Sequence, residues 1–194
     1  GLPEEDEGVA SLLHEGRTIG CFQIESPGMR SLLRMLHAST RRDVIHALSL
    51  IRPGPSASGM KERFIRRRLG EEAVEYDDPR LEPVLRETHG VMLFQEDILK
   101  VAQVIAGFTL EQGDALRKAI SKQRSPERVE ALRGEFLAGA RRRGATTESA
   151  ARLWQCIANF AAYSYCKAHA VTYGGLAWQA TWLKAHHPAE FLAA

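Results

Sequence analysis

Residues 125–144, "SPERVEALRGEFLAGARRRG", predict one complete helix together with both of its ends. Ser125 is a favoured N-cap, because its side-chain oxygen can accept a hydrogen bond from a backbone N–H that has no partner inside the helix. Pro126 suits the first helical position, where no N–H is needed. Gly144 is typical of the position just after a helix. We therefore expect a helix that begins at Pro126 and ends at Gly144.

The same helical spacing recurs along the rest of the chain, with apolar residues three and four positions apart. Proline cannot continue a helix, so "RPGP" at residues 52–55 and Pro188 are expected to end helices. Thr146 or Thr147 is a candidate cap. "VMLFQ" at residues 91–95 predicts a brief strand. The predicted fold class is mainly α, with at most a short strand pair and with further helices at 31–40, 42–51, 97–107, 110–123, 146–164 and 170–188.

The composition is that of an ordinary globular chain, with 194 residues, 44% hydrophobic residues, 26 basic and 24 acidic side chains. No apolar run approaches the roughly eighteen residues of a membrane-spanning helix, and the first ten residues are acidic, so the cytoplasm is the simplest expectation. The three cysteines form no C-x-x-C motif, which argues against a disulfide framework or a thiolate zinc site. The chain lacks an initiator Met and stops within an apolar helical pattern, so we expect a piece of a longer protein.

The charges are unevenly distributed. Residues 1–25 contain six acids and one base, whereas residues 112–143 contain nine bases and four acids, and "KERFIRRRLG" at 61–70 is a second basic segment. Such blocks favour a polyanionic partner. Solvated helix faces would produce the same blocks, so charge alone does not decide between the two interpretations.

The predicted helix at 110–122 has one basic face. At about 100° per residue, Arg117, Lys118 and Lys122 fall on one side together with Asp114, while Leu116 and its apolar neighbours fall on the other. Arg can donate two hydrogen bonds to one phosphate, so this face suits a phosphate ligand. A solvated face is the alternative.

The segment "AAYSYCKAHAVTYG" at 161–174 carries several polar and aromatic groups near a predicted helix start. Lys167 and His169 would lie beside unpaired N–H groups, an arrangement that favours an anion. Tyr173 is four residues after His169 and shares its face. The Gly174-Gly175 pair would allow a close approach to the backbone. The alternative, favoured on these residues alone, is that the tyrosines are core aromatics and the glycines make a helix contact.

Four long blocks resemble, in order and spacing, the fingers region of bacterial C-family DNA polymerases, which comprise the DNA polymerase III alpha subunits and their error-prone relatives. These blocks are "CFQIESPGMRSLLRML", "LIRPGPSASGMKERFIRR", "THGVMLFQEDILKVAQVIAGFTLEQGDALRKAISK" and "FAAYSYCKAHAVTYGGLAWQATWLKAHHPAEFLAA". The resemblance implies that residues 1–194 are a fragment of this helical fingers region, with 1–25 an acidic lead-in near the junction with the palm. The palm, PHP and C-terminal domains would lie outside this chain.

The resemblance also implies binding roles. Contacts to the incoming deoxynucleoside triphosphate would come from Arg117, Lys118, Lys122, Lys167, His169 and Tyr173, and contacts to template and primer DNA from Arg52, Arg66, Arg67 and Arg124. Two positions depart from the usual Phe-Asn-Lys-Ser-His block, since Cys166 replaces Asn and Ala168 replaces Ser. The fidelity class is therefore not predicted. A sliding clamp and other replisome subunits would be met through the domains outside this chain.

No catalytic or metal-binding residue is predicted here. In the family, three palm aspartates hold the Mg²⁺ ions, and this chain has no Asp-x-Asp; Asp77-Asp78 precedes a proline and is expected in a turn. The His186-His187 pair lacks metal-ligand spacing, and Trp178 and Trp182 are expected in the core. The isolated chain should bind substrate elements without performing the chemistry. Two other classes remain open, a stand-alone helical nucleic-acid-binding module and a helical protein-interaction scaffold.

Overall fold

The structure, a computed structural model, describes residues 1–51, 59–121, 125–161 and 164–193. The chain divides into two compact units. Unit 1 consists of Gly1–Arg52 together with Lys167–Ala194, and unit 2 consists of Pro53–Cys166. Unit 2 is therefore an insertion, in sequence, between the two segments of unit 1.

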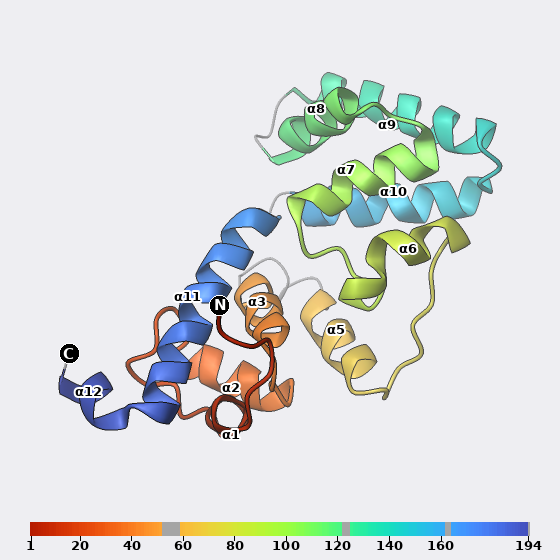
Figure 1. Ribbon diagram of the computed structural model, residues 1–194. Helices are drawn as coiled ribbons and strands as arrows, with labels where there is room; N and C mark the ends of the chain where they lie inside the picture. The colour runs from red at the N-terminus through yellow and green to blue at the C-terminus, as the bar shows by residue number, and fades with distance from the viewer. Residues whose placement is uncertain (52–58, 122–124, 162–163, 194) are drawn as a thin grey trace. The chain divides into compact units, whose positions relative to one another are not determined.

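Unit 1 is built on a long helix from its C-terminal segment. Its helices are α1 (Glu7–His14), α2 (Pro27–Met35), α3 (Arg41–Leu50), α11 (Lys167–His186) and α12 (Pro188–Ala193). Helix α11 packs against α3 and α1 (Figure 1). The helix predicted at 42–51 is confirmed as α3. The helix predicted at 31–40 corresponds to α2, but it begins earlier, at Pro27 behind the Ser26 cap, and ends at Met35, so the bounds of that prediction are wrong. Pro188 ends the long helix as predicted, but the chain continues into the short α12.

Close packing in unit 1 explains part of the 161–174 segment and its neighbours. A Cβ atom on Gly174 would collide with the side chain of Ile45 on α3, so this glycine permits α11 and α3 to approach closely. The helix-contact interpretation is thereby supported for Gly174. Trp178 is a core residue, 1% exposed, and its Nε1 donates to the carbonyl of Pro3 at 2.9 Å.

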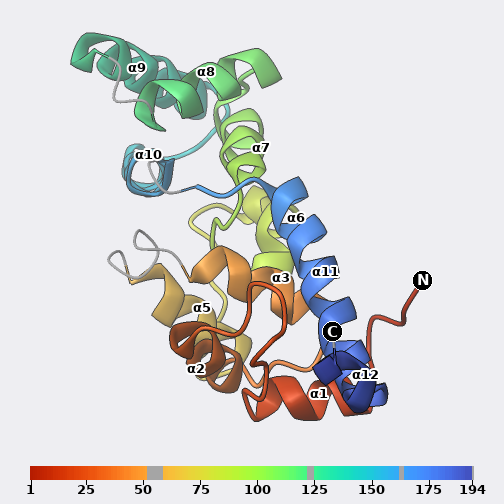
Figure 2. The same ribbon diagram turned by 90° about the vertical axis from the view of Figure 1, so that its left-hand side faces the viewer.

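Unit 2 is a helical assembly around one large apolar core. Its helical elements are α5 (Met60–Arg68), η1 (Pro79–Leu81), α6 (Glu82–Leu85), η2 (Arg86–Thr88), α7 (Gln95–Ala106), α8 (Leu110–Ser121), α9 (Pro126–Arg142) and α10 (Thr147–Ala161). Helix α7 packs against α8, α9 and α10, and Figure 2 shows α7 from a second direction. Phe136 is fully buried between Phe108 and Trp154, with ring centroids 6.1 and 5.8 Å away.

Both predicted ends of α9, the start of α10 and the predicted end of α7 are confirmed, whereas α7 begins at Gln95 rather than Asp97, and the predicted end of the helix at 110–123 lies outside the described residues. Ser125 Oγ accepts from the Arg128 N–H at the start of α9, and Gly144 follows its last turn with φ +87°. Of the two candidate threonines, Thr146 caps α10, since its Oγ1 accepts from Ser149 N–H at 3.1 Å. Gly107 ends α7 in the left-handed conformation, with φ +73°.

The brief strand predicted at 91–95 is wrong. The structure assigns no strand among the described residues, and Phe94 forms only an isolated bridge to Tyr165. The carboxylate of Asp97 accepts from the Leu93 and Phe94 N–H groups, both at 2.9 Å, and so begins α7 directly. The segment is apolar because it is buried on all sides, not because it belongs to a sheet. The mainly α class is confirmed.

The helices that the structure describes include none that combines the length and the apolar character needed to cross a membrane.

Candidate nucleotide and DNA contact sites

The two predicted triphosphate contacts on α8 are held by one carboxylate. Arg117 Nη2 lies 2.7 Å from Asp114 Oδ1, and Lys118 Nζ lies 2.6 Å from Asp114 Oδ2. Lys118 and then Arg117, through their hydrogen bonds, lower the pKa of Asp114, so its side chain stays charged at neutral pH. The three groups together carry one positive charge.

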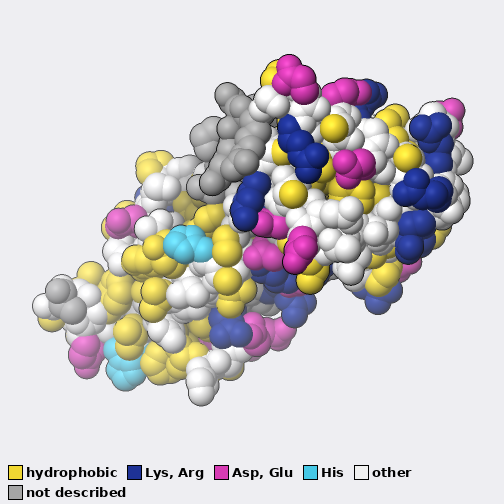
Figure 3. Space-filling model, turned by 90° about the horizontal axis from the view of Figure 1, so that it is seen from above, with side chains coloured by type: hydrophobic (Ala, Val, Ile, Leu, Met, Phe, Trp, Pro, Cys, Tyr) yellow, Lys and Arg dark blue, Asp and Glu magenta, His cyan; other side chains and the backbone are white. Residues whose placement is uncertain are grey.

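The exposure of the two cations differs. The side chain of Arg117 is 18% exposed and that of Lys118 is 48% exposed. Buried Leu116 and Ala119 anchor the opposite face of α8 in the core. Because Asp114 already restrains the Arg117 guanidinium, less side-chain freedom is lost when an anion binds. Figure 3 shows that the face of unit 2 containing α8 and α9 carries acidic and basic side chains side by side.

A hollow of about 360 Å³ lies beside this cation pair, between α8 and α9. Arg128, in the first turn of α9, lines it together with Lys118, Asp114 and Glu111. Arg128 has no ion pair within the described part of the chain. In the sequence Arg128 is only one member of a basic block, because no local pattern places the start of α9 next to α8.

The predicted contacts at the start of α11 lie in unit 1. The rings of His169 and Tyr173 are 3.8 Å apart, which confirms that they share one helix face. Phe22 packs edge-on against Tyr173 at 5.3 Å. His169 is exposed, whereas Lys167 and Tyr173 are half-buried. The exposed imidazole of His169, near the start of this 20-residue helix, therefore rests on the ring of Tyr173, which packs in turn against Phe22.

The two predicted DNA contacts on α5, Arg66 and Arg67, differ in their exposure to solvent. Arg66 and Arg67 both pair with Glu72, at 2.9 and 3.0 Å. Arg66 and then Arg67 lower the pKa of Glu72 through their hydrogen bonds. Arg67 also donates to the carbonyl of His89 at 3.2 Å, and its side chain is only 9% exposed, against 50% for Arg66. Arg66 is therefore the more accessible cation, and Arg67 holds the local fold together.

Three predicted site residues, Arg52, Lys122 and Arg124, lie outside the described residues. The remaining predicted contacts are divided between the units. Unit 2 contains Arg66, Arg67, Arg117 and Lys118, and unit 1 contains Lys167, His169 and Tyr173.

The residues that the structure describes do not form a metal-binding centre. No group of three or more His, Cys, Asp or Glu side chains among them is arranged to hold an ion, so a two-metal site does not fit them. Asp77 pairs with Arg152 at 2.8 Å, and Asp78 accepts from the Arg80 N–H at 2.9 Å as the N-cap of η1. Both aspartates therefore serve the local fold.

The helical fold agrees with the comparison of sequences: the chain belongs to the bacterial DNA polymerase III alpha subunit finger domain family, whose model matches residues 1–144. The chain is 44% identical over 192 residues to the DNA polymerase III subunit alpha of Aquifex aeolicus, which covers 99% of this chain and 16% of that protein. It is 38% identical over 198 residues to the Escherichia coli K12 protein of the same name, which covers 100% of this chain and 17% of that protein. The chain thus spans about one sixth of the length of these relatives.

Proposed function

We propose that this chain contacts the incoming deoxynucleoside triphosphate through α8 and the start of α11, and DNA backbone through the exposed cations of α5. The observation that carries the proposal is the Arg117–Asp114–Lys118 cluster, because a pre-positioned guanidinium beside an exposed ammonium suits a triphosphate. Arg128, which lines the adjoining hollow, is added to the predicted contacts.

The reaction assigned to the whole subunit is template-directed deoxynucleotidyl transfer in the cytoplasm. Mg²⁺ would be held by palm aspartates outside this chain. The role of the described residues would be to position the nucleotide and the DNA. Contacts to a sliding clamp and to other replisome subunits would also come from other parts of the subunit. Membership in the finger domain family favours this proposal over a stand-alone nucleic-acid-binding module or a protein-interaction scaffold.

The isolated chain is expected to show no primer extension at any Mg²⁺ concentration. Phosphoryl transfer between nucleotides needs clustered carboxylates to hold the metal ions, and the described residues supply no such cluster. The measurement is template-dependent extension of a labelled primer by the purified chain, with the whole subunit as the positive control. Extension above the no-enzyme background would contradict our placement of the catalytic centre.

Binding of DNA to the chain is expected to be weak and steeply salt-dependent. If about three or four exposed cations meet phosphates, release of counterions should lower the affinity roughly 40- to 150-fold between 50 and 200 mM salt. Removing one such cation with Arg66→Ala should reduce the slope of log K against log salt by about 0.9 for duplex DNA. An affinity that is unchanged across this range would favour the scaffold alternative.

A further inference from the structure

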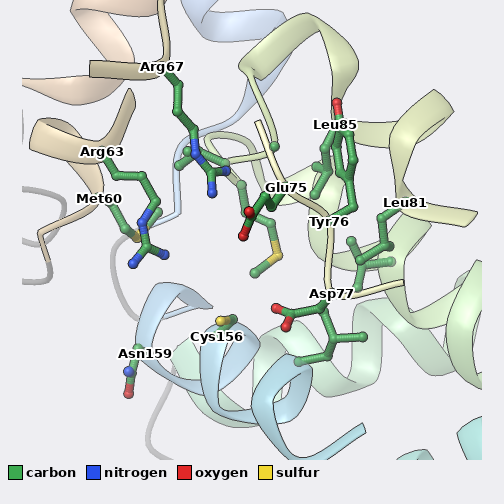
Figure 4. A pocket seen from close by; sticks show the side chains of 15 residues that line it. Met60, Arg63, Arg67, Glu75, Tyr76, Asp77, Leu81, Leu85, Cys156 and Asn159 are labelled. Carbon is green, nitrogen blue, oxygen red and sulfur yellow. The ribbon is translucent and has the colours of Figure 1, made fainter. Parts of the chain in front are cut away.

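Unit 2 contains a cavity of about 250 Å³. Arg67, a predicted DNA contact, lines it, but this side chain is engaged by Glu72 and by the carbonyl of His89. It lies between α5, the segment 75–77, α6, α7 and α10, and we call it the α5–α10 pocket (Figure 4). Its floor is apolar and rigid, since it is formed by the core side chains of Leu81, Leu85, Met92, Val101 and Leu153, each at most 8% exposed. Its mouth is polar, with Arg63, Glu75, Asp77, Cys156 and Asn159.

The volume and lining set the class of ligand. Small-molecule sites usually run from about 300 Å³ upward, so this pocket suits a compact body of about ten heavy atoms. The aliphatic floor offers no hydrogen bonds and therefore favours a ligand with apolar faces. The polar mouth requires that the same ligand carry hydrogen-bonding groups along one edge. A single heterocyclic ring system meets both requirements.

The charged groups at the mouth differ in how strongly neighbouring charges engage them. Asp77 is paired with Arg152, and both oxygens of Glu72 are already engaged by neighbouring arginines of α5. Arg63 forms a long ion pair with Glu72, at 3.8 Å and without a hydrogen bond, and its side chain is 56% exposed. Glu75 is exposed and has no ion pair within the described residues. Figure 4 shows Arg63 and Glu75 facing the same open space from different elements.

We propose that the α5–α10 pocket receives one unpaired nucleobase that carries an exocyclic amino group. A carboxylate is the acceptor that proteins use for the amino group of cytosine, and Glu75 supplies one at the edge of the pocket. Thymine presents a carbonyl at that position, which a carboxylate repels. The base inserts against the aliphatic floor, and the exposed guanidinium of Arg63 meets its carbonyl or an adjacent phosphate.

Single-stranded DNA is the source of this base, a step that rests on the proposed function. Bases in a duplex are stacked and paired, so only an unpaired nucleotide can place its base in this pocket at small cost. The negative charges of the carboxylates at the mouth offset the positive charges of the arginines, so the phosphate backbone of the DNA stays outside the pocket. An apolar side chain from another part of the subunit would also fit the floor, but it would leave Glu75 without a partner.

Cys156 provides a direct test because its thiol lies at the mouth of the pocket. In the polymerase subunit that contains this chain, the rate of Cys156 alkylation by iodoacetamide would be measured by peptide mass spectrometry with deoxycytidine or thymidine added. Deoxycytidine at millimolar concentration is expected to slow alkylation at least threefold in a saturable manner. Thymidine should slow it less than 1.5-fold, because its base has a carbonyl where cytosine has the amino group that Glu75 would bind. Glutathione added to the same reaction serves as the reference for reagent reactivity, since a free thiol in solution is unaffected by the pocket.

With Glu75→Gln, deoxycytidine and thymidine are expected to slow the alkylation of Cys156 equally little. The control Glu71→Gln changes an exposed residue outside the pocket, so deoxycytidine should still protect Cys156 more than thymidine does. Equal protection by both nucleosides, or none by either, would overturn the inference. So would a Cys156 that is unreactive without any ligand, since another part of the subunit would then fill the pocket. Nucleosides carry no phosphate, so this result does not depend on the salt titration that tests the proposed function.

Discussion

Arg117→Ala is expected to lower the efficiency of single-nucleotide incorporation by the polymerase subunit by about ten- to a hundredfold. A charge-assisted hydrogen bond to a triphosphate is worth roughly 1.5 to 3 kcal/mol, and each 1.4 kcal/mol is about a factor of ten. Asp114 holds this guanidinium in place, so alanine removes a pre-positioned donor and leaves the carboxylate to repel the nucleotide. The measurement is incorporation over a range of nucleotide concentrations, with DNA affinity determined separately.

Arg133→Ala is the matched control for this substitution. Arg133 pairs with Glu130 on α9 at the same i,i+3 spacing as Arg117 and Asp114, and its side chain is more exposed, at 44%. An exposed pair of this kind contributes little, so the control should leave incorporation within about twofold. If Arg117→Ala weakens DNA binding while nucleotide affinity is unchanged, α8 contacts the DNA backbone and our nucleotide assignment is wrong.

Gly139→Ala is expected to lower the free energy of unfolding by about 1 to 3 kcal/mol, although alanine is the better helix former. A Cβ atom at this position on α9 would collide with the backbone carbonyl of Ala106, the last residue of α7. A backbone carbonyl cannot rotate away as a side chain can, so the two helices must separate. The measurement is thermal or denaturant unfolding of the chain.

Gly134→Ala, on the same helix, is the control, and it is expected to change the free energy of unfolding in the opposite direction. Nothing lies within 4 Å of a Cβ atom built on this residue. Alanine there should therefore stabilise the chain by roughly 0.5 to 1 kcal/mol through backbone entropy alone. Equal effects of the two substitutions would show that α7 and α9 do not pack as closely as described.

The helices were predictable from the sequence where local chemistry determines both ends. The helix at 125–144 has a cap, a proline and a terminal glycine within its own sequence, and α9 begins and ends as these residues predict. The segment 91–95 was mispredicted because a short apolar run looks the same in a strand and in a buried link between helices. Only tertiary packing, with Asp97 beginning α7, separates the two.

The candidate site was predictable in its cations but not in their partners. Helical spacing placed Arg117 and Lys118 on one face, and it placed Asp114 there too, yet only the structure shows that one carboxylate holds both. The burial of Arg67 depends on Glu72 and on the carbonyl of His89, which lies 22 positions along the chain. The α5–α10 pocket draws its lining from segments spread over about a hundred residues, so no local pattern predicts it.

The division of unit 1 into two segments affects how the chain folds during its synthesis. Helix α3 buries Val44, Ala47 and Leu48 in a unit that also requires α11, which emerges only after the whole of 53–166 has been made. At about 5 to 20 residues per second, a ribosome needs roughly 6 to 23 seconds to produce that insertion. Unit 2 is continuous in sequence and can fold during this interval. The apolar face of α3 stays uncovered until α11 has been made. A pause in translation within 53–166 would prolong the exposure of that face, and a chaperone bound there would protect the nascent chain from aggregation.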